Sequence, residues 1–261
     1  MKRKFKSGSF LFAGLVLAVL YIPIGMVIAF SFNEQELGIK WTGFTLKWYR
    51  DLFEHPDAVA AFRNSMVVSG VTTAISIMMG AFAAIGFHRY EFKGKTALDS
   101  FLYVPTIVPA MLLGVSLFSF YDILGIPLSK VTIIIAHVTF CVPVTFNTIL
   151  SSLNGFDGSI EEAARDLGCN ELQTILKVIL PNIIPAMISS GLLAFTFSFE
   201  DVMTSFFVAG PGDQTLSMYI FGQIKTGVKP TLNALSTLVI LTMVALGVLS
   251  QIAESKDRTQ E

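Results

Sequence analysis

The sequence predicts an all-α integral membrane protein with six transmembrane helices. Of its 261 residues, 53% are hydrophobic and only 14% are charged, whereas a soluble domain carries about 25% charged residues. Six stretches of the chain lack Asp, Glu, Lys and Arg, and each has the roughly 20 apolar residues that a membrane-spanning helix needs. These stretches are continuously apolar rather than alternating, which favours helices over the strands of a β-barrel.

The composition also excludes several functional classes. The formal net charge of −1 leaves no basic face that would hold a nucleic acid. The two cysteines, Cys141 and Cys169, and the three separate histidines form neither a disulfide framework nor a metal-binding pattern. No Ser/His, His/Glu or Cys/His arrangement lies in the apolar stretches at a spacing that would serve catalysis. We therefore expect no catalytic residue, metal or cofactor in this chain.

The six apolar stretches define a single transmembrane domain of residues 1–261. They are Ser7–Asn33, Asn64–His88, Ser100–Tyr121, Val131–Phe156, Val178–Phe199 and Thr231–Ala253. We place the spans at about residues 9–32, 64–87, 100–121, 131–151, 183–208 and 231–253. The fifth span continues past an acidic pair, Glu200–Asp201, into a further apolar run.

The first stretch follows four basic residues, as the apolar part of a signal peptide would. Its apolar run exceeds the roughly 7–15 residues of such peptides, and no small-x-small cleavage site closes it, so we interpret it as an uncleaved first span. The loop that follows, residues 34–63, contains Trp41, Trp48 and Tyr49. These side chains favour an interfacial helix.

The orientation follows from the distribution of Lys and Arg. With the N-terminus inside, eleven of these residues fall in cytoplasmic segments and seven in outer segments. Because positive charge is retained on the cytoplasmic side, we expect a multi-pass protein of the inner membrane with both termini in the cytoplasm.

The longest cytoplasmic loop, residues 152–182, is predicted to contain two short helices. Ser159 and Glu162 have the spacing of a capping box, so the first helix should begin at Ser159. Gly168 should end it, because a left-handed residue is least costly when it is glycine.

The second helix has its own start signal in Asn170 and Gln173. Pro181 should then limit its regular backbone bonding. Its apolar residues fall on one stripe, formed by Leu172, Ile175, Leu176, Ile179 and Leu180. The loop is either a hairpin that merely links two spans, with Glu162 as a cap, or a docking element whose small residues, Ala163 and Ala164, seat in a groove of another protein.

This loop resembles the signature loop of ABC importer permeases. The matching positions are Glu162, Ala163, Ala164, Gly168, Val178 (where the family has Ile), Leu180 and Pro181. In that family the loop forms the coupling helix, which seats in a cleft of the ATPase subunit. The resemblance implies the type I ABC importer permease fold and a role of residues 159–168 in transmitting ATP-driven closure to the spans.

Nearly the whole chain is similar to the spermidine/putrescine permeases of the PotC-like family. The matching segments are Tyr21-Ile-Pro-Ile, Ser31-Phe-Asn33, Phe44-Thr-Leu-Lys-Trp48-Tyr49, Ala136-His137-Val-Thr-Phe-Cys141, Ala209-Gly-Pro-Gly212, Gly227-Val-Lys-Pro230 and Asn233-Ala-Leu. The resemblance implies polyamine translocation beside a second homologous permease, an extracytoplasmic binding protein and an ATPase dimer that binds ATP and Mg. The sequence itself has no Gly-x-x-x-x-Gly-Lys loop for ATP.

One position departs from the family pattern. Pro109-Ala110 stands where polyamine permeases commonly carry Pro-Asp, and the loss of that carboxylate keeps open permeases for opines, 4-aminobutyrate or aminophosphonates. A self-sufficient channel or secondary transporter is a further alternative. It is less favoured, because such transporters often have internal repeats and several intramembrane ionisable groups.

Glu200 and Asp201 are the only acidic residues inside an apolar span. Charges at membrane depth usually face a cavity or a partner, and about 1.5 Å per residue from Pro185 places this pair roughly 22 Å up, in the outer half. Either the pair lies at the outer interface, solvated or paired with another permease, or one carboxylate lines a pathway for a cationic substrate. The resemblance favours Asp201 for this role.

The other polar and aromatic residues of the spans are less informative. His137 is alone in the fourth span, and we expect its ring to bond a neighbouring carbonyl. The phenylalanines of the third and fifth spans should face lipid or the bundle, with one or two available to gate the pathway or to stack on an ammonium group. They are Phe118, Phe120, Phe195, Phe197 and Phe199.

Overall fold

The computed structural model describes residues 7–35, 40–155, 158–226 and 229–257. Within these ranges the secondary structure is helical, apart from one isolated antiparallel bridge between Asn33 and Phe44. The protein is therefore all-α, as predicted. Two compact units are distinguished, residues 60–221 and residues 1–59 with 222–261, and each is described by itself.

The described residues contain four helices that are long and apolar enough to cross a membrane, or five if one bent pair is counted as a span. The four lie in α1 (Ser7–Phe30), α3 (Pro56–Arg89), α6 (Lys130–Asn154) and the continuous helix Glu171–Glu200. α12 (Pro230–Asp257) coincides with the predicted sixth span, but its apolar part is described only as Pro230–Val244.

The predicted third span is not one straight helix. α4 (Lys95–Ile107) and α5 (Ala110–Ile123) are bent by 104°. Val108 between them is extended, with φ −67° and ψ 128°. The cause is local, because a proline disfavours the α conformation of the residue before it, and Pro109 follows Val108.

The predicted fifth span is also interrupted. α9 (Leu180–Glu200) ends at the acidic pair, where Asp201 is extended, and α10 (Met203–Val208) begins after it. The expectation of one helix over residues 183–208 is therefore wrong. The Asp201 carboxylate accepts hydrogen bonds from the backbone N–H groups of the next turn. Aspartate often ends one helix and begins another in this way, because its side chain replaces a backbone carbonyl as the acceptor.

The loop between the fourth and fifth spans has the two predicted helices. α7 (Ser159–Asp166) begins at Ser159, as predicted, and its N-cap residue is Gly158. At its end Gly168 has φ +88°. The amides of Gly168 and Cys169 donate to the carbonyls of Arg165 and Ala164 at 2.8 and 3.0 Å, which is the pattern of a Schellman motif.

The second helix of the loop is continuous with the membrane helix. α8 (Glu171–Thr174) starts with the predicted capping box of Asn170 and Gln173. A π-helical turn, Ile175–Ile179, then leads directly into α9. Pro181 therefore does not end the helix. It follows a widened turn, and the Asn182 side-chain amide donates to the Val178 carbonyl at 2.7 Å.

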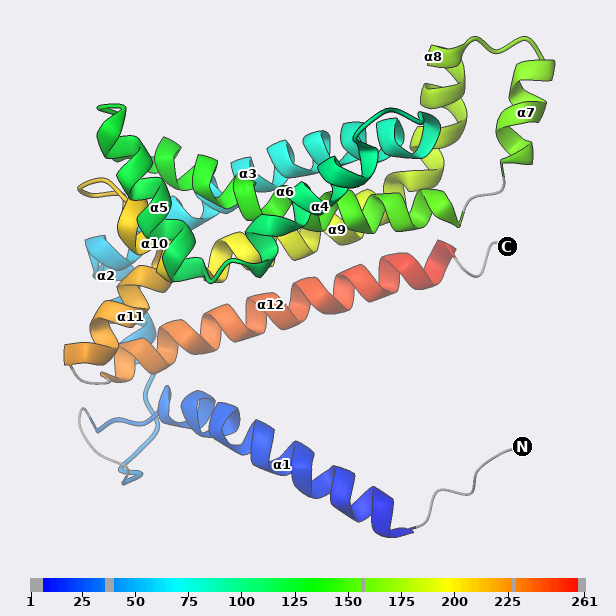
Figure 1. The fold of residues 1–261 in the computed structure, drawn as a ribbon. Helices are drawn as coiled ribbons and strands as arrows, with labels where there is room; N and C mark the ends of the chain where they lie inside the picture. The colour runs from blue at the N-terminus through cyan, green and yellow to red at the C-terminus, as the bar shows by residue number, and fades with distance from the viewer. Residues whose placement is uncertain (1–6, 36–39, 156–157, 227–228, 258–261) are drawn as a thin grey trace. The chain divides into compact units, whose positions relative to one another are not determined.

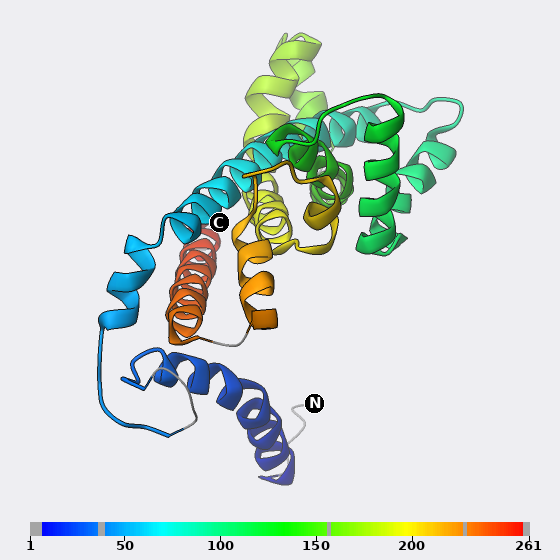
Figure 2. The ribbon, with the colours of Figure 1, turned by 90° about the vertical axis from the view of Figure 1, so that its left-hand side faces the viewer.

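The core of the unit of residues 60–221 lies between α3, α6 and α9. α6 and α9 run side by side in Figure 1, and Figure 2 shows α3 crossing obliquely beside them. Its buried members are Ala81, Ala84, Phe87, Phe146, Ile149, Leu153, Ile179 and Ile183. Gly80 permits the close approach of α3 to α6, because a Cβ there would collide with the Thr145 side chain. A second cluster joins α5 and α10 to α3 and α6 through Val68, Tyr121, Ile133, Ala136 and Val208.

The other unit is built from α1, α2 (Lys47–Glu54) and α12, with α12 packing on both α1 and α2. α2 confirms a helix at the aromatic segment, with Trp48 and Leu52 buried. The indole N–H of Trp48 donates to the Asn33 carbonyl at 2.7 Å. α11 (Leu216–Thr226) spans the boundary between the two units and was not anticipated from the sequence.

Candidate functional site

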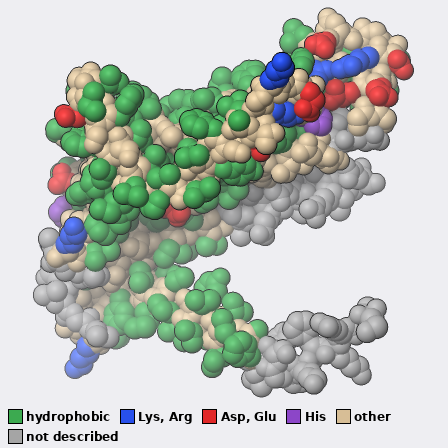
Figure 3. Space-filling view, viewed as in Figure 1, with side chains coloured by type: hydrophobic (Ala, Val, Ile, Leu, Met, Phe, Trp, Pro, Cys, Tyr) green, Lys and Arg blue, Asp and Glu red, His purple; other side chains and the backbone are tan. Residues whose placement is uncertain are grey.

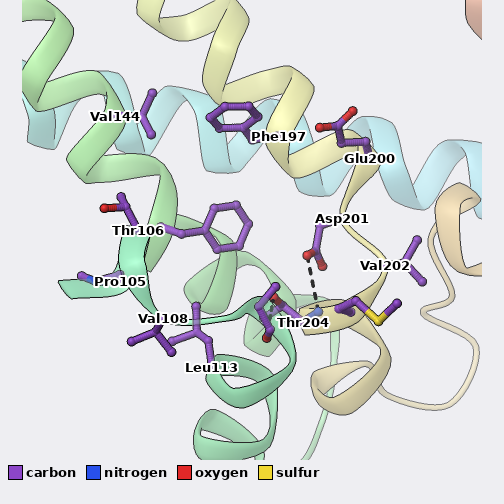
Figure 4. Close-up of a pocket in the computed structure, with 13 residues that line it drawn as sticks. Pro105, Thr106, Val108, Leu113, Val144, Phe197, Glu200, Asp201, Val202 and Thr204 are labelled. Carbon is purple, nitrogen blue, oxygen red and sulfur yellow. Dashed lines mark hydrogen bonds between the residues drawn. The ribbon is translucent and has the colours of Figure 1, made fainter. Parts of the chain in front are cut away.

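A cavity of about 680 Å³ opens where the two helix breaks come together. The α4–α5 break supplies one wall, the α9–α10 break another and the middle of α6 a third (Figure 4). Its lining is mainly apolar and consists of Pro105, Thr106, Val108, Ala110, Leu113, Phe140, Val144, Phe197, Glu200, Asp201, Val202, Met203 and Thr204. At 1.5 Å per residue, Phe140 is about 15 Å from the start of α6, so the cavity lies at membrane depth.

Asp201 is held within the protein. Its carboxylate accepts hydrogen bonds from the Ser205 amide at 2.8 Å, the Ser205 hydroxyl at 2.9 Å and the Thr204 amide at 3.4 Å. Its side chain is only 10% exposed. These bonds place a negative charge at the N-terminus of α10, where the helix dipole favours it.

His137 of α6 extends the same network. Its Nδ1 lies 2.7 Å from the Ser198 hydroxyl, and its Nε2 lies 2.9 Å from the Ser205 hydroxyl and 3.3 Å from the Asp201 carboxylate. The expectation of a bond to a backbone carbonyl is therefore wrong. A fully buried ring needs partners for both nitrogens, and here side chains of α9 and α10 supply them.

Glu200 differs from its neighbour. It borders the cavity, it is exposed, and within the described residues its carboxylate has no hydrogen bond or ion pair. In Figure 4 the two acidic side chains diverge, with Asp201 directed toward the first turn of α10 and Glu200 directed away from it. Glu200 is also the last residue of α9, at the negative end of that helix dipole.

Two aromatic rings line the cavity, Phe140 of α6 and Phe197 of α9. Of the five phenylalanines singled out from the sequence, only Phe197 is in the lining. Phe140 was missed, although its ring lies 5.2 Å from that of His137 between centroids, three positions earlier on the same helix. The spacing of three residues from His137 could have indicated that Phe140 lies on the same face of the helix.

The α7–α8 hairpin carries the predicted coupling residues. Glu162, Ala163 and Gly168 are exposed. Ala164 is 8% exposed and therefore buried, so the two alanines do not share one open face. Leu167 is 86% exposed and joins this surface. Leu167 was not among the predicted residues, although an apolar residue beside the helix-ending glycine is a recognisable feature.

Leu180 and Pro181 lie apart from that surface. They begin α9, with Leu180 half-buried against the core of α3, α6 and α9 and Pro181 exposed. The hairpin itself is strongly charged. Figure 3 shows acidic and basic side chains gathered over α7 and α8, whereas hydrophobic side chains cover the helices beside them. Such a surface is suited to water or to a protein partner rather than to lipid.

Residues 76–254 match the family model described as "Binding-protein-dependent transport system inner membrane component". The chain is 40% identical over 257 residues to the spermidine/putrescine transport system permease protein PotC of Haemophilus influenzae, covering 98% of this chain and 99% of that protein. It is 36% identical to PotC of Escherichia coli K12, covering 95% and 94%. The putrescine transport system permease protein PotI of the same strain is also 36% identical, covering 85% and 81%.

Solved structures show the same fold. A bacterial ABC transporter involved in the import of alginate matches with a TM-score of 0.68 at 15% identity, over 97% of this chain and 99% of that one. An amino acid ABC transporter crystallised with histidines matches with a TM-score of 0.61 at 16% identity, over 82% and 100%. At these identities the likeness concerns the fold alone.

Proposed function

The chain belongs to the binding-protein-dependent transport system inner membrane components and, within them, to the spermidine/putrescine permease family, and from this premise we propose that its substrate is a polyamine. It is the permease subunit of an ABC importer in the inner membrane and is not itself the ATPase.

The unpaired carboxylate of Glu200 carries the proposal for the substrate. Its position at the C-terminal end of α9 adds the partial negative charge of the helix to its own. A bound cation would offset the negative charge at that position, and an ammonium group donates strong hydrogen bonds to a carboxylate. The aromatic lining, Phe140 and Phe197, offers ring faces that attract cations.

The rest of the lining suits the methylene chain of a polyamine. Val108, Leu113 and Val144 are apolar side chains around the same cavity, and alkyl segments are favourably removed from water by such surfaces. Asp201 has its acceptor capacity largely used within the protein. We therefore assign ammonium binding to Glu200, and to Asp201 the task of holding the pathway wall.

Ala110 favours a second candidate class. It lines the cavity at the position where polyamine permeases commonly have aspartate. Among the described residues, the lining therefore offers one carboxylate without a partner, where two would suit a diamine. A solute with one ammonium group, such as 4-aminobutyrate, is the alternative. A self-sufficient transporter is not supported by a family whose members work as subunits.

We assign the docking surface for the ATPase to the exposed residues of the hairpin, Glu162, Ala163, Leu167 and Gly168. Leu180 and Pro181 then connect the hairpin to α9 rather than contacting the partner. We propose with it that the hairpin and both chain termini lie in the cytoplasm. The assembly would contain an ATPase dimer that binds ATP and Mg, a second permease and an extracytoplasmic binding protein, in keeping with the alginate transporter solved with its periplasmic protein.

The test is uptake by proteoliposomes that contain the chain with its ATPase, second permease and binding protein. Labelled spermidine, putrescine and 4-aminobutyrate are compared at low concentration, with the native chain and with Glu200→Gln. The proposal expects ATP-dependent uptake of the polyamines and a selective loss of that uptake in the variant. Uptake of 4-aminobutyrate alone would support the second candidate, and polyamine uptake unchanged by Glu200→Gln would remove Glu200 from the pathway.

A further inference from the structure

Three consecutive residues, the last two of α3 and the one that follows, each contact a different segment of the hairpin region. His88 Nδ1 lies 3.3 Å from Asn154 Oδ1, at the end of α6. An Arg89 terminal nitrogen lies 3.4 Å from Glu161 Oε2, on α7. The Tyr90 hydroxyl donates to Glu171 Oε2 at 3.4 Å, on α8. We refer to His88, Arg89 and Tyr90 as the α3 clasp.

The contact between Arg89 and Glu161 is the central one, because both side chains are removed from water. Their exposed fractions are 5% and 12%. Neither terminal nitrogen of Arg89 has a hydrogen-bond partner among the described residues, so the carboxylate of Glu161 is the group that compensates the buried charge. A buried guanidinium that loses its counter-charge is strongly destabilised, and the position of α7 is therefore tied to the end of α3.

The end of α3, to which α7 is tied, is held rigidly by core packing. Phe87, next to the clasp, is buried and packs edge-to-face on Phe146 of α6, with ring centroids 5.0 Å apart. The same core includes Ile179 and Ile183, near the start of α9. A displacement of α7 cannot be absorbed at the end of α3 without disturbing this packing, since close-packed interiors transmit small shifts.

The α3 clasp thus joins the surface assigned to the ATPase to a helix that runs the length of the core. We propose that Arg89 is a positioning residue that transmits movement of α7 to α3 during the transport cycle. His88 and Tyr90 hold the end of α6 and the start of α8 next to the same end of α3. This inference rests on the proposed docking role of the hairpin. It adds a second path into the membrane besides the continuous helix from α8 to α9.

The experiment uses the full complex in proteoliposomes, with Arg89→Gln, Glu161→Gln and the exchanged pair Arg89→Glu with Glu161→Arg. Four quantities are measured, namely retention of the ATPase during purification, basal ATP hydrolysis, hydrolysis stimulated by the loaded binding protein, and uptake per ATP. Arg50→Gln is the matched control, because Arg50 and Glu54 form an exposed ion pair, at 82% and 67%, in the other unit, and exposed pairs contribute little.

The expected result is that both single variants retain the ATPase and basal hydrolysis but lose about tenfold in uptake per ATP, within the range of coupling between linked sites. The exchanged pair should recover most of that loss, which a merely structural role in folding would not require. Arg89→Lys keeps the positive charge and should therefore lose less uptake per ATP than Arg89→Gln. Arg50→Gln should behave like the native chain.

Normal uptake per ATP in Arg89→Gln would overturn the clasp, as would an exchanged pair that is no better than the single variants. Should Arg89→Gln fail to insert, uptake per ATP in Arg89→Lys and Glu161→Gln tests the clasp instead. A failure of the docking proposal is seen separately. It would appear as normal coupling in a Gly168→Leu complex, whatever the Arg89 variants do.

Discussion

Substitution of Gly168 separates backbone strain from contact with the ATPase. Its φ of +88° costs a residue with a side chain about 1–2 kcal/mol. A Cβ at this position would have no neighbour within 4 Å, so alanine and leucine suffer the same strain within the chain. They differ only in the bulk that they present at the tip of the hairpin, beside the exposed Leu167.

Gly168→Ala and Gly168→Leu should therefore lower the stability of the hairpin equally, by about 1–2 kcal/mol, but should affect transport unequally. We expect Gly168→Ala to keep most of its uptake. Gly168→Leu should lose about tenfold or more, equivalent to about 1.4 kcal/mol of docking energy, together with stimulated ATP hydrolysis. Gly168→Asn is the control for strain, because asparagine tolerates positive φ better than other residues with a side chain.

The assay is uptake and ATP hydrolysis by the reconstituted complex, with protease sensitivity of residues 158–170 as the measure of hairpin stability. Equal transport by the alanine and leucine variants would refute docking at Gly168. Equal loss in both, with recovery in Gly168→Asn, would assign the effect to strain alone. A hairpin much more protease-sensitive in the leucine variant would show that the space around Gly168 is not open.

Glu200→Gln should reduce uptake of a cationic substrate about tenfold at low concentration, with basal ATP hydrolysis as the unchanged control. This is the lower end of the effect of a charged hydrogen bond, because Glu200 is exposed. Ala110→Asp should raise uptake of putrescine relative to 4-aminobutyrate, and an unchanged ratio would count against the cavity as the selective site. Gly80→Ala should lower the thermal unfolding temperature, because overpacking costs about 1–3 kcal/mol, whereas Gly86→Ala on the same helix has open space and should not. A reporter active only in the cytoplasm should work when fused after Glu171 and fail after Leu52 or Asp213, and activity after Asp213 would contradict the proposed orientation.

The parts of the fold that local chemistry determines could be predicted from the sequence. Asn170 and Gln173 form their capping box, and Gly168 takes the left-handed conformation that ends α7, because these bonds involve residues only a few positions apart. Charge-free stretches located the spans but not the helix ends. α3 begins at Pro56 and includes Asp57 and Arg63, since a helix continues into water wherever its backbone bonds are retained.

The helix breaks were predicted less well, for two different reasons. The bend at Val108 has a local signal in Pro109 that a count of apolar residues does not use. The break at Asp201 has a local cause, because its carboxylate accepts from the first turn of α10. It also has a distant one that spacing along the chain does not show, because that carboxylate and the hydroxyl of Ser205 contact His137 on α6. The burial of Ala164 is likewise decided by how the hairpin folds on itself, which the spacing of residues along one helix does not reveal.

The two breaks explain why a charge can be present at membrane depth. Irregular backbone is tolerated there only where it is buried or lines a cavity, and here side chains satisfy it. Asp201 accepts from the first turn of α10, the Thr204 hydroxyl donates to the Ala110 carbonyl at 3.4 Å, and the Thr132 hydroxyl donates to the Val208 carbonyl at 2.7 Å. One consequence is an asymmetry between the helix ends that the two acidic residues face. Asp201 faces the positive end of α10, where its charge is already compensated, and Glu200 is left at the negative end of α9, where a cation from the cavity would complete the site.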